Sequence, residues 1–293
     1  MKFSTDTLKY VCFSTGERGD IFSLVMDVMG YSFSESLKFI SKFFNLSDEA
    51  ISTNSKSVKP FGGFYRKIAK AEQYPEFNMS VYDESILNEY RGHYNILFFR
   101  DGIDFDTQNY FDVGYDFSTN RITIPEYTLT GELCGIMGRL NESNCDKAER
   151  WLPIIPCSRG LTLYGYHKNY ANIQQKNVVV IGESEKFVMQ LHSMGIDVGL
   201  SICGCSISKT QQKYIKGLMA KQIILALDEG LEEEQIREEA KKLCSCNKML
   251  TSKIGYIYDA ENDVLLKGGK QSPSDLGKEA FEELYKNHVV WLN

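Results

Sequence analysis

The chain has 293 residues, a formal net charge of -6, 43% hydrophobic and 25% charged residues, proportions typical of a globular protein with roughly two compact units. It contains no low-complexity tract and no repeat with a period of roughly 20 to 50 residues, which excludes a disordered, collagen-like or solenoid chain. No run approaches the ~18 apolar residues of a membrane span, and no secretory signal opens the sequence, so we expect a cytoplasmic protein. The mildly acidic balance argues against sequence-blind adhesion to nucleic acid but leaves room for a local basic groove.

Eight cysteines are dispersed along the chain, and four histidines accompany them. Because no secretory signal is present, we expect reduced thiols rather than disulfides. No two cysteines form a C-x-x-C pair, and the closest spacing is Cys-x-Cys at 203/205 and 244/246. A structural zinc ion needs about four ligands, so this pattern predicts no zinc site.

The first 55 residues predict a small, mainly helical unit. Apolar residues recur at helical spacing over 19–29 and 33–44, and Ser34 is the expected N-cap of the second helix. A polar stretch at 46–58, followed by the breakers at 59–63, indicates a linker. We place a domain boundary near residue 55.

Residues 56–175 predict a mixed α+β domain, and residues 176–293 predict a β/α domain. The first is broken by Gly, Asn or Asp into short segments, including a β-hairpin over 121–125 and 131–139. In the second, buried strands alternate with helices, the strands at 178–181, 199–203, 223–227 and 254–258 and the helices at 187–194, 209–219 and 232–243. This alternation is typical of a parallel sheet, so the expected fold class is α/β.

Two of the buried strands are followed by acidic residues. Glu183 comes two residues after Ile181, and Asp228 directly follows Leu227. Because the carboxyl ends of parallel strands form the ligand crevice, both side chains should enter one cleft, where they would hold Mg²⁺ or Mn²⁺ for phosphoryl chemistry. The alternative is that each acid only caps the helix after its strand.

Other catalytic patterns do not occur in the sequence. The histidines form no Ser/His/Asp or Cys/His set by spacing, and there is no G-x-x-x-x-G-K-[ST] sequence, which excludes a fused helicase or P-loop ATPase. The aromatic pair Phe98 and Phe99 has apolar neighbours, so we expect it in the core rather than as a base-stacking platform.

Several segments, taken in their order, resemble one family. VVVIGESEKFVMQLHSMG (178–195), SICGCSIS (201–208) and IILALDEG (223–230) resemble the Toprim domain, which DnaG-type primases of bacteria and phages share with topoisomerases. Upstream, RITIPEYTLTGELCGIMGRL (121–140) and RGLTLYGY (159–166) resemble the basic subdomain that precedes Toprim in those primases alone. The resemblance covers roughly residues 10–290 and is patchy from 45 to 90.

Residues 10–40 resemble the second half of the zinc-binding domain that opens these primases. The family has two cysteines separated by two residues there, whereas this chain has Cys12 and Thr15. One remaining ligand cannot hold zinc, so the resemblance implies a truncated remnant without zinc, with Cys12 as a remnant ligand. Such a remnant is either vestigial or completed by a partner chain. No helicase-binding domain is recognised after the Toprim segments, so we expect that contact with a replicative helicase uses another surface or is absent.

The resemblance implies roles for acidic residues. Glu183 corresponds to the Toprim glutamate, Asp228 to the first aspartate of an Asp-x-Asp pair, and Asp275 to a late acidic residue. Gly230 stands where the family has its second aspartate, and the neighbouring Glu229 is the candidate to reach the same cation. The implied metal ligands are therefore Glu183, Asp228, Glu229 and Asp275.

It also implies roles for basic residues. Arg139 would be a catalytic contact to template phosphate or to the incoming nucleotide, because a guanidinium can bond two phosphate oxygens at once. For each of Arg139, Arg150, Arg159 and Lys186 the alternative is an ordinary surface charge. The full set of candidates is Arg121, Arg139, Arg150, Arg159 and Lys186. A groove built from Arg121, Arg139 and the basic segment 56–70 would hold single-stranded template.

The function implied by the resemblance is that of a DNA primase of phage or prophage character. It would join ribonucleoside triphosphates into short RNA primers on single-stranded DNA, by Mg²⁺- or Mn²⁺-dependent nucleotidyl transfer in the cytoplasm of a bacterium or infected host. One alternative is a Toprim nuclease with the same acidic site, against which the upstream basic subdomain argues. The other is a catalytically degenerate module that still binds DNA or helicase, which Gly230 and Thr15 favour.

Overall fold

The computed structural model describes residues 2–4, 9–12, 18–44, 79–142, 147–244, 252–261, 263–265 and 268–292. The chain divides into two compact units, Met1–Asn78 and Met79–Asn293. The predicted basic segment at 56–70 and Thr15 lie outside the described residues. In the part of the chain that is described, no helix is both long and apolar enough to cross a membrane.

The first unit combines the two predicted helices with a small sheet that the sequence did not reveal. Its elements are the antiparallel strands β1 (Lys2–Ser4), β2 (Lys9–Val11) and β3 (Arg18–Asp20), followed by α1 (Ile21–Met29) and α2 (Phe33–Phe43). Strands of three residues are too short to show a period-2 pattern. The expected N-cap was wrong: Ser32 caps α2, because its side chain accepts the N–H of Glu35 while Glu35 accepts the N–H of Ser32.

The second unit contains a smaller, antiparallel sheet of order β4-β5-β6-β7. Its strands are β4 (Gly114–Asp116), β5 (Arg121–Tyr127), β6 (Leu133–Leu140) and β7 (Trp151–Ile155), and the short helices nearby are η2 (Glu84–Glu89), α4 (Ile96–Arg100), α5 (Phe105–Tyr110), α6 (Lys147–Arg150) and η3 (Arg159–Leu161). The predicted hairpin is confirmed as β5 and β6, with Gly131 at φ +90° in the turn. Of the aromatic pair, Phe98 is fully buried but Phe99 is half exposed.

The larger sheet of this unit has the order β12-β11-β10-β8-β9, and it confirms the α/β class. Four strands are parallel and β12 is antiparallel. The strands are β8 (Val178–Gly182), β9 (Gly199–Ser201), β10 (Gln222–Leu225), β11 (Lys253–Ile257) and β12 (Val289–Leu292), and the helices are α7 (Tyr166–Lys176), α8 (Glu185–Ser193), α9 (Lys209–Gly217), α10 (Glu233–Lys241) and α11 (Lys278–Asn287).

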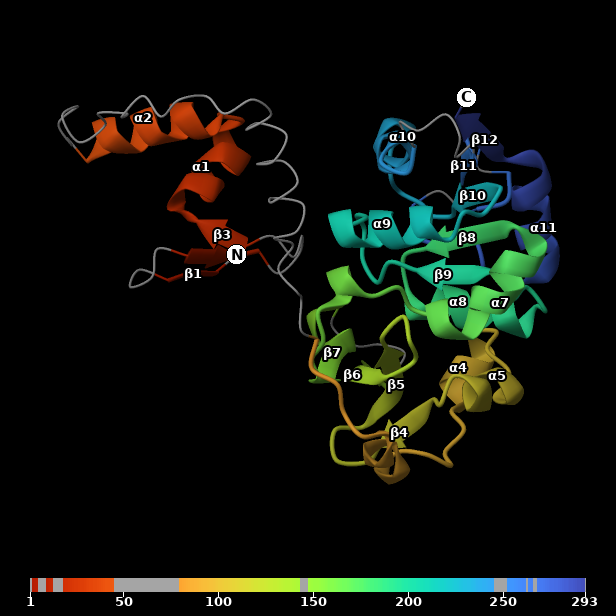
Figure 1. Ribbon diagram of the computed structural model, residues 1–293. Coiled ribbons are helices and arrows are strands. Elements are labelled where there is room, and N and C mark those ends of the chain that lie inside the picture. The colour runs from red at the N-terminus through yellow and green to blue at the C-terminus, as the bar shows by residue number, and fades with distance from the viewer. Residues whose placement is uncertain are drawn as a thin grey trace. The chain divides into compact units, whose positions relative to one another are not determined.

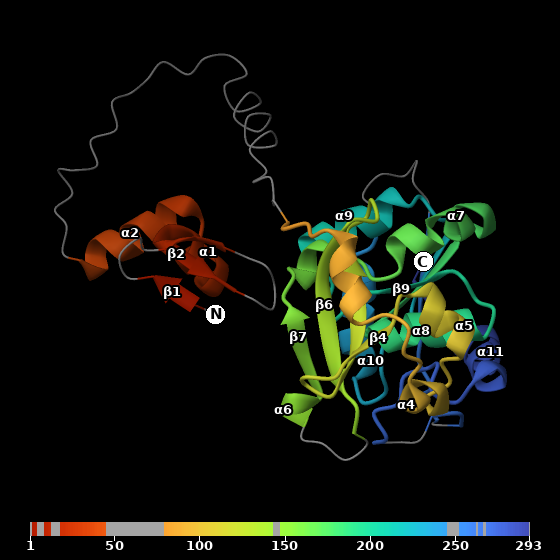
Figure 2. The ribbon, with the colours of Figure 1, turned by 90° about the horizontal axis from the view of Figure 1, so that it is seen from below.

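The helices cover both faces of this sheet, which explains why its central strands are apolar throughout. α8 lies on one face of the sheet, and α9 and α10 lie on the other (Figure 1). Right-handed crossovers require this arrangement, because the chain first moves from β8 to the edge strand β9 and then returns past β8 to β10. Val179, Ile181 and Leu225 are fully buried as a result. The side of α8 that faces away from the larger sheet packs against α5, and α4 lies close by (Figure 2). Residues of both sheets belong to one apolar core.

Candidate active site

Glu183 and Asp228 lie together at the carboxyl end of the parallel sheet. β8 and β10 are neighbours in register, with Ile181 opposite Leu225, so the residues that follow the two strands leave the sheet side by side. The backbone N–H of Asp228 donates to Oε1 of Glu183 at 3.0 Å. The side-chain oxygen of Ser184, not a carboxylate, caps α8 by accepting the N–H of Phe187. Glu232 is the N-cap residue of α10, so neither Glu183 nor Asp228 caps the helix that follows its strand.

The two carboxyl groups are held where their charges are costly. Burial and the negative charge of Asp228 raise the pKa of Glu183 to about 7. Burial is also the main cause that raises the pKa of Asp228 above its usual value. Among the described residues, no group donates a hydrogen bond to the buried Oδ1 of Asp228. A buried oxygen without a donor costs free energy, and two carboxylates with open acceptor positions fit a hard divalent cation.

Asp275 joins this acidic edge through hydrogen bonds rather than as an isolated charge. Its Oδ1 is 2.6 Å from Nζ of Lys186 and its Oδ2 accepts the N–H of Ser272 at 2.9 Å. Burial acts to raise its pKa, but Lys186 and these hydrogen bonds outweigh it and hold the pKa of Asp275 below its usual value. The Ser272 side chain also acts to lower the pKa of Asp228 against the effect of burial. Lys186, expected to contact phosphate, is thus paired with Asp275.

Glu229 faces the loop beside the acidic pair. Its Oε1 accepts the N–H of Gly268 at 2.8 Å and its Oε2 accepts the N–H of Lys270 at 3.0 Å. Both oxygens therefore hold the backbone of this loop. Gly230, which follows, is exposed and has φ +106°, a conformation that favours glycine.

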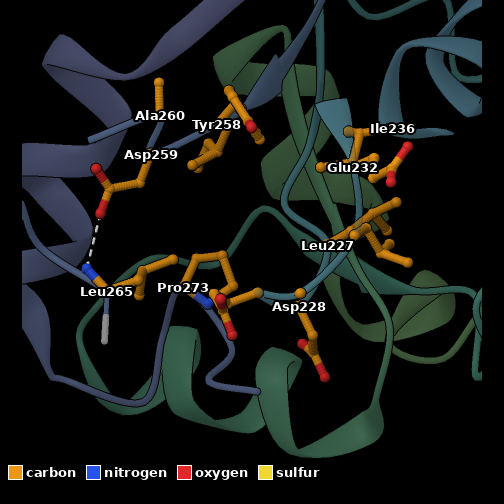
Figure 3. Close-up of a pocket in the computed structure, with 13 residues that line it drawn as sticks. Leu227, Asp228, Glu232, Ile236, Tyr258, Asp259, Ala260, Leu265 and Pro273 are labelled. Carbon is orange, nitrogen blue, oxygen red and sulfur yellow. Dashed lines mark hydrogen bonds between the residues drawn. The ribbon is translucent and has the colours of Figure 1, made fainter. Parts of the chain in front are cut away.

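A pocket of about 280 Å³ opens next to Asp228. Its walls include Leu231, Tyr258 and Pro273. Figure 3 shows Asp228 and Asp259 on different sides of it, with the Asp228 carboxylate turned away from Asp259. Asp259 differs from Asp228, because its carboxylate oxygens already accept the backbone N–H groups of residues 263–265 at 2.7 to 3.1 Å. We therefore do not count Asp259 as a candidate metal ligand. The open carboxylate of this region is that of Asp228.

Arg139 occupies a sheltered position on β6. Its guanidinium lies 3.2 Å from Oδ2 of Asp101 and stands over the rings of Phe98 and Trp151, at 5.5 and 5.9 Å from their centroids. Its side chain is 12% exposed. A guanidinium held this way is oriented before any ligand arrives, which suits an electrostatic contact.

Arg121 and Arg150 meet in the smaller sheet. Arg121 is 8% exposed, and its guanidinium donates to the carbonyl oxygens of Gly138, Glu149 and Arg150 at 2.9 to 3.4 Å. Arg121 thus connects α6 to β6 through buried hydrogen bonds. The sequence, in which Arg121 begins a predicted strand, did not indicate this structural role. Arg150 ends α6 and its side chain is half-buried.

Arg159 is enclosed in a second acidic cluster, formed by Glu126 of β5 and Glu185 of α8. It donates to Oε1 of Glu126 at 2.8 and 3.0 Å and pairs with Glu185. Ligand atoms of Glu126, Glu185 and Cys203 lie within 4.8 Å of one another, a spacing that a metal ion could use. Burial and Glu126 raise the pKa of the Cys203 thiol to about 12, and the guanidinium already supplies the positive charge.

Sequence reasoning missed both glutamates of this cluster. Glu126 follows a proline within a strand and Glu185 stands in the first turn of a helix, where an acidic residue is ordinary. No local pattern marks them as buried. Nor does any pattern mark Gln190 and Ser272, whose contacts come from segments far apart in the chain.

Comparison with known proteins gives distant relatives. No family model matches the chain. The SPbeta prophage-derived protein YorJ of Bacillus subtilis is 25% identical over 94% of this chain and 80% of its own length. DNA primases of Clostridium acetobutylicum and Chlamydia muridarum are each 22% identical, over 75% and 96% of this chain. The chain spans about half the length of these primases, 42% and 52%.

Solved structures show the same relationship in the fold. The zinc-binding and RNA polymerase domains of the Aquifex aeolicus primase match 99% of this chain and 75% of theirs, with a TM-score of 0.56 and 18% identity. A DnaG primase catalytic domain bound to single-stranded DNA matches 71% of this chain and 77% of its own, with a TM-score of 0.55 and 15% identity. The chain is therefore a distant homologue of DNA primases and has the fold of the DnaG catalytic core.

Proposed function

We propose that this chain is the catalytic core of a DnaG-type primase with a Toprim domain, which makes short RNA primers on single-stranded DNA from ribonucleoside triphosphates. The related primases and the shared fold support this proposal, and the prophage origin of YorJ supports a phage setting. Template binding is supported by the related DnaG domain that was solved with single-stranded DNA.

The single observation that carries the proposal is the open carboxylate pair at the end of β8 and β10. Glu183 and Asp228 are in hydrogen-bond contact through the Asp228 backbone, and Oδ1 of Asp228 is buried with no donor in the described chain. Most buried side-chain oxygens have a hydrogen-bond donor, and the other carboxylate oxygens without one in the described chain, those of Asp101 and Asp197, lie in ion pairs with Arg139 and His192. The pair is instead arranged as ligands for Mg²⁺ or Mn²⁺, with Asp275 as the third carboxylate.

The residues around the pair fit nucleotidyl transfer. A divalent cation bound there would polarise phosphate oxygens and stabilise the charge that develops as the primer hydroxyl attacks the α-phosphate. Glu183 and Asp228 would hold that cation, and Lys186 would hold Asp275 in place beside them. Arg139, oriented by Asp101, would offset charge on the triphosphate. Glu229 we assign to holding the loop at 268–270, where both its oxygens bond backbone N–H groups.

A second candidate function follows from Gly230. The exposed glycine, at φ +106°, offers no carboxylate where the resemblance implies a second aspartate. A chain that keeps the fold but lacks this ligand would still bind template or a helicase without synthesis. A primase would make an RNA product, and this binding module would make none.

The experiment is primer synthesis on single-stranded templates with labelled ribonucleotides and Mg²⁺ or Mn²⁺, resolved on a denaturing gel. We expect short products from the wild type, and a loss of roughly 100-fold or more for Glu183→Ala and Asp228→Ala, because each removes a proposed metal ligand. Glu234→Gln is the matched control, since Glu234 is an exposed acid of α10. Template binding without product in the wild type would favour the binding module, and shortened template without ribonucleotides would favour a nuclease.

A further inference from the structure

Gln190 of α8 is a buried polar residue placed between two parts of the proposed site. Its exposed fraction is 1%. Its Nε2 donates to the carbonyl oxygen of Asp101 at 2.6 Å and to Oδ1 of Asp275 at 3.1 Å. Its Oε1 accepts the hydroxyl of Ser274 at 2.6 Å. Each polar atom of the amide therefore has a partner, and the partners come from two segments of the second unit, at residue 101 and at residues 274–275.

The partners of Gln190 lead in two directions. On one side Asp275 pairs with Lys186 and accepts the N–H of Ser272. On the other side Asp101 pairs with Arg139 at 3.2 Å. A series of contacts thus runs from Asp275 through Gln190 and Asp101 to Arg139 of the smaller sheet.

We propose that Gln190 is a positioning residue. It fixes the distance between the Asp275 carboxylate and the Asp101 segment, whose side chain pairs with Arg139. This inference rests on the proposed function, because it takes the acidic edge to be the cation site. Gln190 itself touches neither the cation nor substrate; it acts through Asp275 and the Asp101 segment.

The chemistry of an amide suits this task better than that of other side chains. Its two N–H groups can bond a carboxylate and a carbonyl at the same time. The Ser274 hydroxyl donates to Oε1 and so fixes the orientation of the amide, with Nε2 toward Asp275. A flipped amide would lose this hydrogen bond. A neutral donor also leaves the charge balance of the Asp275 and Lys186 pair unchanged.

The test compares Gln190→Leu with Gln108→Leu. Gln108 is a matched control, because it is also 1% exposed and makes three hydrogen bonds, to Asn95 and Ile103, away from the acidic edge. Both changes remove a buried amide and keep the apolar volume. For each protein, Mn²⁺ affinity is measured by electron paramagnetic resonance, and stability by urea unfolding.

We expect Gln190→Leu to weaken Mn²⁺ binding by about 10-fold, as is usual when a residue that supports a metal ligand is removed. Gln108→Leu should leave Mn²⁺ binding unchanged at a similar loss of stability. Should Gln190→Leu fail to fold, Ser274→Ala removes only the hydroxyl that orients the amide, and it should weaken Mn²⁺ binding in the same direction by a smaller factor.

Equal Mn²⁺ affinities in wild type, Gln190→Leu and Ser274→Ala would overturn the inference and leave Gln190 a packing residue. That result is separable from a failure of the proposed function. If the wild type makes no RNA but binds Mn²⁺ more tightly than Gln190→Leu, the positioning role holds and the primase does not. If the wild type binds no Mn²⁺, both are overturned.

Discussion

Two pairs of acids in the second unit, one buried and one half-buried, differ in what neutralises them. Glu126 and Glu185 are 3% exposed, and Arg159 pairs with both of them. Glu183 and Asp228 also have burial as the main cause of their raised pKa values, yet Oδ1 of Asp228 has no donor within the described residues. The first pair is closed by a cation of the chain itself, and the second is open.

The comparison shows how a cluster of charges with a structural role can be distinguished from a candidate metal site. Buried charges persist only when they are paired and hydrogen-bonded. Arg159 meets that requirement for Glu126 and Glu185, so this cluster needs nothing from outside. The open pair does not meet it, and a divalent cation would complete it. We therefore place the proposed chemistry at Glu183 and Asp228, although among the described residues it is the ligand atoms of Glu126, Glu185 and Cys203 that lie within 4.8 Å of one another.

Removing the internal cation should have the largest effect. Arg159→Met leaves Glu126 and Glu185 buried side by side, and we expect a loss of about 3 kcal/mol in the free energy of unfolding, the usual cost of an uncompensated buried charge. Urea unfolding followed by circular dichroism measures it. The double variant Arg159→Met, Glu126→Gln should recover part of the loss. A loss below about 1 kcal/mol, typical of exposed ion pairs, would show that the cluster is not closed by Arg159.

Neutralising the open pair should stabilise the protein. The pKa of Glu183 is raised from 4.5 to about 7, so the folded state binds this proton more tightly than the unfolded chain, and stability falls as the pH rises through that interval. Glu183→Gln removes the penalty. In the absence of divalent cations we expect a gain on the order of 1 to 2 kcal/mol at pH 8, reduced for partial exposure.

This gain should shrink as the pH falls toward 4.5 and vanish below it, where the glutamate is protonated in both the folded and the unfolded state. Thermal unfolding at several pH values, in buffer with a chelator, measures it. Excess Mn²⁺ should reverse the order at pH 8, because only the wild type gains the binding free energy. Destabilisation by Glu183→Gln at pH 8 without metal would contradict the idea of an open pair.

Adding a carboxylate at Gly230 should have the smallest effect. A Cβ there would meet no atom within 4 Å, but the backbone has φ +106°, so Gly230→Asp should cost about 1 kcal/mol through strain alone. Gly230→Asn carries the same strain without charge and is the control. We expect Mn²⁺, measured by paramagnetic resonance, to bind Gly230→Asp several-fold more tightly than Gly230→Asn. Equal affinities would show that residue 230 lies out of reach of the open pair.

The sequence alone indicated the architecture and the position of the acidic pair. Continuous apolar runs such as 178–181 mark strands covered on both faces, and this pattern depends only on neighbouring residues. Glu183 and Asp228 could be named because strand ends of a parallel sheet share one edge. The strands β8 and β10 do lie side by side.

Only the tertiary structure decided which charges are open and which are closed. Arg159 meets Glu126 and Glu185 across 33 and 26 positions of the chain, and Gln190 meets Asp275 across 85. Arg121, expected in a basic groove, bonds backbone carbonyls inside the smaller sheet. Such pairings leave no periodic trace, because burial of a charge depends on what packs over it from distant segments. The sequence therefore determined where acids gather, and the packing determined that Arg159 closes one pair, while Oδ1 of Asp228 in the other has no donor among the described residues.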